Sequence, residues 1–227
     1  MATAAAKRRT RPGGTRRGAP TAPTREVILD TAERLFAARG VDGVAVRDLA
    51  SEMGITASSL YNHFPGKQAL YDAVLERGLG PIVETVAVAW QEGLRPDRVH
   101  ATLGTLTAHL ARHPHLARLL QRALLEDSAS VQALIEGWVR SLYREGLAAI
   151  RTAARDAGWR DDEVPHLAVA LFGLIFSYFT NTTALRRLGG WGDDPLSERA
   201  LAVQRRFLEQ AILRLLGPRP RRVAAKR

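Results

Sequence analysis

Hydroxyl, amide and cationic side chains gather in one short part of this sequence, at Arg47, Thr56, Ser58, Ser59, Asn62 and Lys67. The two serines and Asn62 could hydrogen-bond to the edges of bases, and an amide matches adenine best. Thr56 and Lys67 suit phosphate oxygens. This set of residue types predicts contact with DNA.

Two short predicted helices position these side chains. The first carries apolar residues at the spacing of one buried helical face, at Val46, Leu49, Ala50 and Met53. Gly54 allows a sharp turn, and Thr56 is placed to cap a second helix from Ala57 to Asn62. That helix has only Leu60 as a clearly apolar residue, so most of its surface suits a polar partner. The pattern predicts a helix-turn-helix, and a tight hairpin inside an all-helical core is the alternative.

The identities of these residues also match a known family. The sequence resembles the DNA-binding domain of the TetR family of bacterial transcriptional regulators in Ala45-Val-Arg-Asp-Leu-Ala50, Gly54-Ile-Thr56, Ser59-Leu-Tyr-Asn-His-Phe64, Lys67 and Leu70. The resemblance extends back through Val27-Ile-Leu-Asp-Thr-Ala-Glu-Arg-Leu-Phe36 and Gly40, so it covers roughly residues 24–74. Ala45 departs from the family pattern, which usually has a capping Thr or Ser at this position.

The resemblance implies DNA phosphate contacts for Tyr61, His63 and Lys67. The alternative for Tyr61 is a half-buried aromatic, and for His63 a packing residue at the turn. The family pattern also implies a homodimer that binds a pseudo-palindromic operator. Its effector would be a small molecule held in a second domain.

The 227 residues are expected to form four parts with an all-α fold. Residues 1–21 would be a disordered basic arm, and residues 22–82 a three-helix DNA-binding domain with the helix-turn-helix at 45–64. Residues 83–217 would be a larger helical domain for ligand binding and dimerisation, followed by a basic tail at 218–227. Short connections between the predicted helices and the lack of an alternating strand pattern support the all-α fold class. Helices are expected at 24–39, 81–93, 96–112, 115–125, 130–157, 163–188 and 196–216.

The net charge of +10 comes from the two ends of the chain. Those ends carry eleven basic residues and no acid, so the middle of the chain has a net charge of −1. Arginines of the N-terminal arm could reach phosphates or an adjacent minor groove. A solubilising tail is the alternative.

The predicted helix at 163–188 is apolar on nearly every side between Leu167 and Phe179, so it must be covered all round. This surplus favours a dimer interface over an ordinary monomer core. The residues predicted to form it are Leu174, Tyr178, Leu201, Leu208 and Ile212.

A small-molecule pocket is predicted where side chains of the second domain could converge. Its candidate residues are Trp90, His109, Trp138, Tyr143, Phe172, Phe176 and Tyr178. Ordinary core aromatics are the alternative. His109 and His113 have the spacing of two metal ligands, but Pro114 disfavours helical geometry at His113, and no metal or cofactor is expected.

The sequence therefore favours a DNA-binding transcriptional regulator, expected to be a repressor released by a small-molecule inducer. Because no G-x-S-x-G, H-E-x-x-H or P-loop motif occurs, no enzyme activity is expected. The N-terminus has no signal-peptide h-region, and the longest apolar run has 14 residues, against about 20 for a bilayer span. A cytoplasmic protein is therefore expected, without a membrane partner. The alternative is a helical ligand- or lipid-binding protein that meets anionic membranes through its basic tails.

Overall fold

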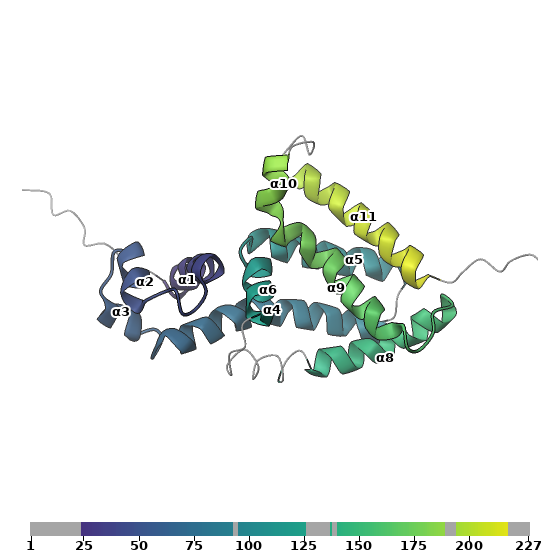
Figure 1. Ribbon diagram of the computed structural model, residues 1–227, viewed down its shortest axis with the longest axis horizontal. Helices are drawn as coiled ribbons and strands as arrows, with labels where there is room; N and C mark the ends of the chain where they lie inside the picture. The colour runs from purple at the N-terminus through teal and green to yellow at the C-terminus, as the bar shows by residue number, and fades with distance from the viewer. Residues whose placement is uncertain (1–23, 93–94, 126–136, 138–139, 189–193, 218–227) are drawn as a thin grey trace, which may run out of the picture.

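The computed structural model describes residues 24–92, 95–125, 137, 140–188 and 194–217 of the chain. The predicted basic arm and basic tail lie outside these residues. All regular structure within the described ranges is helical, which confirms the all-α fold (Figure 1). The helices are α1 (Arg25–Arg39), α2 (Val46–Glu52), α3 (Ala57–Tyr61), α4 (Lys67–Glu92), α5 (Pro96–Arg112), α6 (Leu116–Leu125), α8 (Arg140–Asp156), α9 (Val164–Thr180), α10 (Thr182–Leu188) and α11 (Glu198–Leu216).

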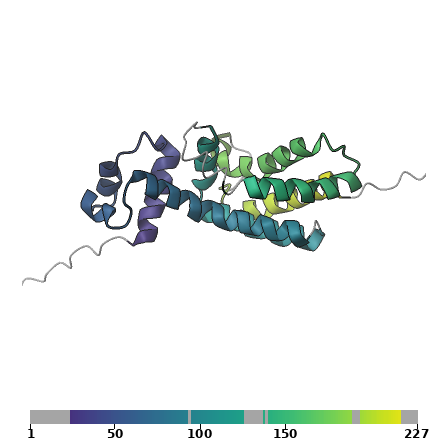
Figure 2. The ribbon, with the colours of Figure 1, turned by 90° about the horizontal axis from the view of Figure 1, so that it is seen from below.

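The first three helices form a small unit at one end of an elongated molecule (Figures 1 and 2). The Thr24 hydroxyl accepts a hydrogen bond from the Val27 N–H at 3.4 Å, which confirms the predicted cap of α1. The rings of Phe36 on α1 and Tyr71 on α4 meet edge to face, with their centroids 5.4 Å apart. One buried cluster therefore joins α1, α2 and α3 to the first turns of α4.

Helix α4 runs without interruption from the small unit into the rest of the molecule (Figure 2). The predicted break before Pro81 is therefore wrong. The sequence Gly78-Leu-Gly-Pro81 serves packing instead: a Cβ at Gly78 would lie 2.2 Å from the buried Leu116 side chain of α6. Contacts of α4 with α5, α6 and α8 hold the helix through the proline, although Pro81 cannot donate a backbone hydrogen bond.

The remaining helices pack around the C-terminal half of α4 and form two core clusters. The single helix predicted at 163–188 is instead two helices, because α9 ends at Thr180 with Asn181 as its C-cap, and α10 leaves at an angle of 63°. Local side-chain bonds explain the end of α9. The Asn181 amide donates to the Ser177 carbonyl at 2.7 Å, and the Thr182 hydroxyl donates to the Phe179 carbonyl at 3.2 Å.

Within the described ranges, no single helix has both the length and the apolar composition of a membrane span. The bent pair of α9 and α10 meets that test only when its two helices are taken together.

Candidate nucleic-acid interface and ligand cavity

The turn before α3 has the geometry that its sequence predicts. Gly54 adopts a φ of 66°, which favours glycine, and the Ile55 N–H donates to the Ala50 carbonyl at 2.9 Å. The Thr56 hydroxyl accepts from the Ser59 N–H at 3.1 Å, as a helix cap does. Because this bond uses an oxygen lone pair, the Thr56 O–H proton remains able to donate to a phosphate.

Helix α3 is anchored by one apolar side chain and presents its other side chains outward. Leu60 is 2% exposed and packs into the cluster that holds α1 and α2. Among the residues predicted to bind DNA, Arg47, Thr56, Ser58, Tyr61, Asn62 and His63 are exposed, and Ser59 and Lys67 are partly buried. Tyr61 is 50% exposed, and His63 lies at the surface rather than packed at the turn. The predicted residues thus lie on α2, on α3 and the residues that flank it, and at the start of α4.

The cap missing at Ala45 is partly replaced by another residue. The Asp48 carboxylate accepts a hydrogen bond from the Ala45 N–H at 3.2 Å, which satisfies one free donor at the start of α2. The departure from the family pattern therefore leaves the helix-turn-helix geometry intact.

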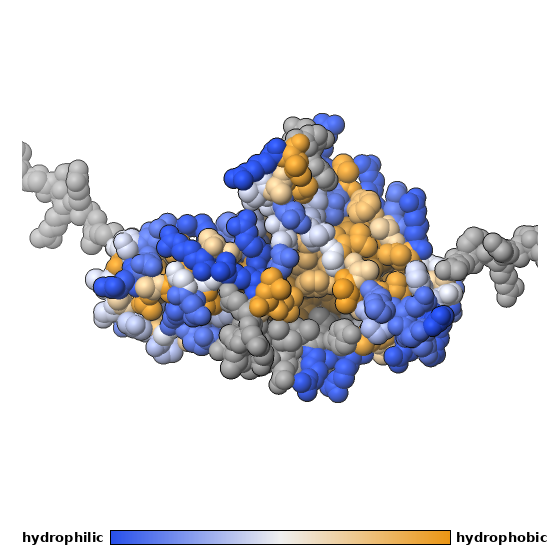
Figure 3. Space-filling model, in the orientation of Figure 1, coloured by the Kyte–Doolittle hydropathy of each residue, from blue (hydrophilic) through white to orange (hydrophobic). Residues whose placement is uncertain are grey.

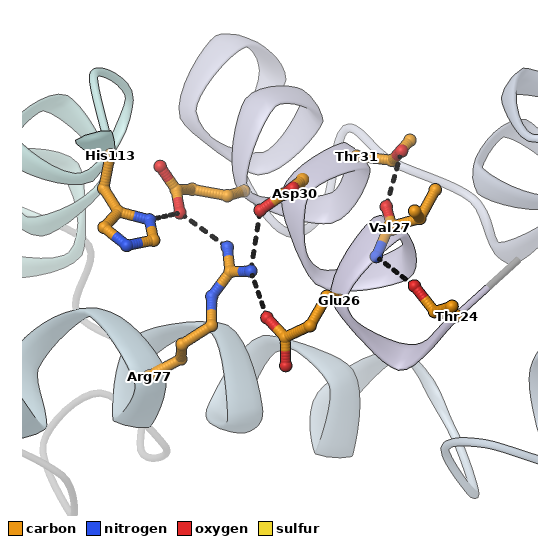
Figure 4. A network of polar contacts seen from close by, with 8 residues as sticks. Thr24, Glu26, Val27, Asp30, Thr31, Arg77 and His113 are labelled. Atoms are coloured by element: carbon orange, nitrogen blue, oxygen red, sulfur yellow. Dashed lines mark hydrogen bonds and ion pairs between the residues drawn. The ribbon is translucent and has the colours of Figure 1, made fainter.

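The acids of the small unit are mostly engaged away from α3. Arg77 on α4 lies 3.2 Å from Glu26, 2.7 Å from Asp30 and 2.8 Å from Glu33, three carboxylates of α1 (Figure 4). The Glu33 side chain is 4% exposed, and its carboxylate also lies 3.3 Å from Nδ1 of His113. This Arg77 cluster joins α1, α4 and the turn between α5 and α6.

His109 packs beside this cluster. Its Nε2 lies 2.9 Å from the Gly78 carbonyl oxygen, and its ring centroid is 4.7 Å from that of His113. Burial lowers the pKa of His109, although the Gly78 carbonyl acts in the opposite direction. A neutral His109 can donate from Nε2 to that carbonyl, so this residue joins α5 to α4.

A cavity of about 390 Å³ lies between α4, α5, α6, α8, α9 and α11. Phe172 and Phe176 stack at 4.4 Å on α9 and line it, as the sequence predicts for pocket residues. Apolar side chains gather around a hollow on the face that carries α6 and α9 (Figure 3). Its rim includes Leu124, Val169 and Phe172, which are all more than a third exposed.

Other predicted pocket residues lie elsewhere, which corrects part of the predicted set. His109 is absent from the lining because its ring points to Gly78. Tyr178 is buried away from the lining, where its hydroxyl donates to the Pro195 carbonyl at 2.7 Å. Trp138 and the side chains of Trp90 and Tyr143 lie outside the described residues.

Comparison with known proteins identifies relatives of this chain. Residues 28–74 match the family model described as bacterial regulatory proteins, tetR family. The chain is 30% identical over 179 residues to the HTH-type transcriptional regulator EthR of Mycolicibacterium smegmatis, covering 74% of this chain and 77% of EthR. The chain belongs to the TetR family. This TetR-family chain is accordingly a DNA-binding transcriptional regulator.

Other relatives agree with this placement. The nucleoid occlusion factor SlmA of Haemophilus influenzae is 26% identical over 112 residues, and the chain spans about half the length of SlmA. Among solved structures, the ketosteroid transcriptional regulator KstR2 of Mycobacterium tuberculosis has a TM-score of 0.63 at 20% identity, covering 83% of this chain and 92% of KstR2. PfmR from Thermus thermophilus has a TM-score of 0.61 at 18% identity, covering 88% of this chain and all of PfmR. These two structures share the fold.

The predicted dimer residues of this TetR-family chain need correction. Tyr178, Leu208 and Ile212 are buried in the core of their own subunit, so they are not available to a partner. Leu174 and Leu201 are partly buried against the same clusters. The apolar spacing of α11 reflects its packing on α5 and α8 of the same chain. The exposed large apolar residues of α9 and α11 are Val169, Phe172, Val203 and Phe207.

Arg25 is a residue near the interface that the sequence did not single out. Its guanidinium lies 5.1 Å from the centroid of the Phe64 ring, just after α3. Because these residues are far apart in sequence, no local pattern could indicate the contact. The sequence feature that pointed to Arg25 as an interface residue was its position at the first turn of α1, after the basic arm.

Proposed function

We propose that this TetR-family regulator is a cytoplasmic homodimeric repressor that leaves its operator when an apolar small molecule fills the cavity. The exposed polar surface of α3 carries the DNA part of this proposal. A helix with one buried anchor and several exposed hydroxyl and amide groups is suited to the major groove. The alternative of a membrane-binding carrier is not favoured, since the similar proteins are transcriptional regulators.

The residues would divide between bases and phosphates. Ser58, Ser59 and Asn62 would reach base edges, since their short polar side chains lie on or beside α3. Arg47, Thr56, Tyr61, His63 and Lys67 would contact phosphates and fix the position of α3. Lys67 begins α4, and the first backbone N–H groups of a helix favour an anion.

The exposed apolar residues of α11 would form the dimer interface. Val203 and Phe207 are 49% and 54% exposed and lie one turn apart on α11. On α9, Gly173 faces open space, which would let a partner helix approach closely. A symmetric dimer of this kind would place two α3 helices about 34 Å apart, on successive turns of a pseudo-palindromic operator.

The effector would act through the helices that form the cavity. Leu79, Ile82 and Val83 line the cavity from α4, and α4 carries Lys67 at its other end. Helices α5 and α6 line it as well, and the turn between them carries His113, which contacts Glu33 of α1. A ligand that binds one arrangement of these helices more tightly shifts the dimer towards it.

A gel-shift titration with the DNA upstream of the chain's own gene tests the DNA contacts. We expect Lys67→Ala and Tyr61→Phe to weaken binding to operator and unrelated DNA alike, with a salt slope lower by about 1 for Lys67→Ala. Asn62→Ala should relax preference at one base position, worth roughly 1–3 kcal/mol.

Arg151→Ala removes an exposed cation of α8 and serves as the control for Lys67→Ala. It should leave the affinity and the salt slope unchanged. If the variants at Tyr61, Asn62 and Lys67 all bind as the wild type does, α3 does not read the operator.

A further inference from the structure

The walls of the cavity restrict the chemistry of what it can bind. Of the 23 lining residues in the part of the chain that the structure describes, only Arg98 and Thr102 carry polar side chains. A ligand with several buried hydroxyl or amide groups would lose their hydrogen bonds to water without replacing them. The buried part of the ligand must therefore be hydrocarbon.

The two polar side chains are not spread over the cavity. Arg98 and Thr102 lie four residues apart, on one face of α5 near its N-terminus. The same face continues to Leu106, about 12 Å along the helix, and is apolar there. The cavity therefore extends over about 12 Å of α5, and the polar side chains among its described lining residues lie towards one end.

The polar end suits a charge that stays in contact with water. The Arg98 side chain is 49% exposed, so an anion bound to it would keep part of its hydration. Arg98 also lies 3.8 Å from the Asp97 carboxylate, with which an anionic ligand would compete. The exposed apolar residues Leu124, Val169 and Phe172 of the rim offer a charged group no side-chain hydrogen bond.

We propose that the cavity binds a single-chain acyl amphiphile, with the alkyl chain along α4 and α5 and the anionic head at Arg98. This inference rests on the proposed function, because it assigns the effector of that repressor. The chain would contact both core clusters at once, through residues such as Val99 and Ile212 in one and Ile82 and Phe176 in the other. Each methylene removed from water adds to the affinity until the cavity is full.

Calorimetric titration with saturated fatty acids of increasing length, below their critical micelle concentrations, tests the assignment. We expect affinity to rise about fourfold per methylene up to a limiting length. At that length the acid should bind about tenfold more tightly than the corresponding alcohol, because a charged head bonds to a guanidinium more strongly. The same chains as coenzyme A thioesters form a second arm. Tighter binding of the acid identifies a free fatty acid as the ligand, and tighter binding of the thioester identifies an acyl coenzyme A. Either result supports an acyl ligand.

Two arginine variants make the test specific. Arg98→Gln should remove the preference for acid over alcohol and keep the dependence on chain length. Arg95→Gln is the matched control, because Arg95 is exposed just before α5 and does not line the cavity. It should behave as the wild type does, with circular dichroism confirming that both variants fold.

Three outcomes would overturn the assignment: affinity that does not depend on chain length, a sterol that binds more tightly than every acyl chain, or an unchanged acid preference in Arg98→Gln. A parallel gel shift separates this inference from the proposed function. Operator binding without acyl binding would refute the ligand alone. Acyl binding that leaves the operator complex intact would refute release by this ligand and keep the cavity assignment.

Discussion

His109 shows how burial of one titratable group affects the whole domain. It is 5% exposed, and its pKa is lowered by burial, as is that of His115 on the adjoining turn. A base whose pKa is lower in the folded state is protonated more readily after unfolding. The stability that it contributes is therefore complete above its ordinary pKa of about 6.5 and is lost as the pH falls below that value.

We expect the wild-type protein to unfold at a lower temperature at pH 5.5 than at pH 7.5, and His109→Gln to show a smaller difference. Thermal unfolding followed by circular dichroism at the two pH values measures this. His63→Gln replaces an exposed histidine and should keep the wild-type difference. An equal pH dependence in His109→Gln and the wild type would show that other groups cause the loss.

Single residues with a local role were predictable from the sequence. Thr24 and Thr56 cap helices, and Gly54 has the positive φ that its turn requires, because these roles depend on neighbours a few residues away. The lining role of Arg98 was not predictable, since it depends on how α5 is rotated against the five other helices that line the cavity.

At the scale of helices, the Arg77 cluster holds α1 against α4. Its partner Glu33 is almost fully buried, whereas Glu26 and Asp30 are exposed. A buried carboxylate that loses its cation is costly, while exposed pairs contribute little. The stabilising part of the cluster is therefore the contact between Arg77 and Glu33.

We expect Arg77→Met to lower the free energy of unfolding by about 3 kcal/mol, because it leaves the buried Glu33 carboxylate without its guanidinium. Adding Glu33→Gln should recover part of that loss. Urea unfolding of the two single variants and the double variant measures the coupling between the residues. Arg34→Met breaks the exposed pair with Glu52 and should cost under about 1 kcal/mol. A similar cost for Arg77→Met and Arg34→Met would contradict the assigned role.

Helix types and most helix ends followed from the sequence, but two breaks were misplaced. Glycine and proline before residue 82 indicated an end, yet Gly78 is required by its close contact with Leu116. At Asn181 the sequence pattern missed a helix end. Hydropathy predicts that the apolar helix continues, but hydrogen bonds from side chains to the backbone terminate it there. Both errors arise from contacts that a periodic pattern does not record.

For the whole molecule, apolar residues that are buried within the subunit cannot contact a second copy, whereas exposed apolar residues can. The sequence indicated a surplus of apolar residues on the last helices, but it could not divide them between the subunit core and a partner. Leu208 is fully buried, whereas Phe207 beside it is 54% exposed. That division needs the positions of α5 and α8.

We expect Phe207→Arg to yield monomers and to abolish tight operator binding, since each half-site alone binds weakly. Light scattering after size exclusion measures the mass, and circular dichroism checks the fold. Val88→Arg on α4 is the matched control, because Val88 is 52% exposed and lies outside the proposed interface. A Phe207→Arg dimer would place the interface elsewhere.

The proline inside α4 also has a mechanical consequence. The 14 helical steps from Lys67 to Pro81 extend about 21 Å, and they connect the small unit to the part of α4 that lines the cavity. A bend of about 10° at Pro81 would move Lys67 by about 4 Å, which exceeds the rise of roughly 3.4 Å per base pair. A shift at the cavity wall can therefore be too small to disturb the packing there and still produce a larger displacement of the helix-turn-helix. That displacement would take the helix-turn-helix out of register with DNA.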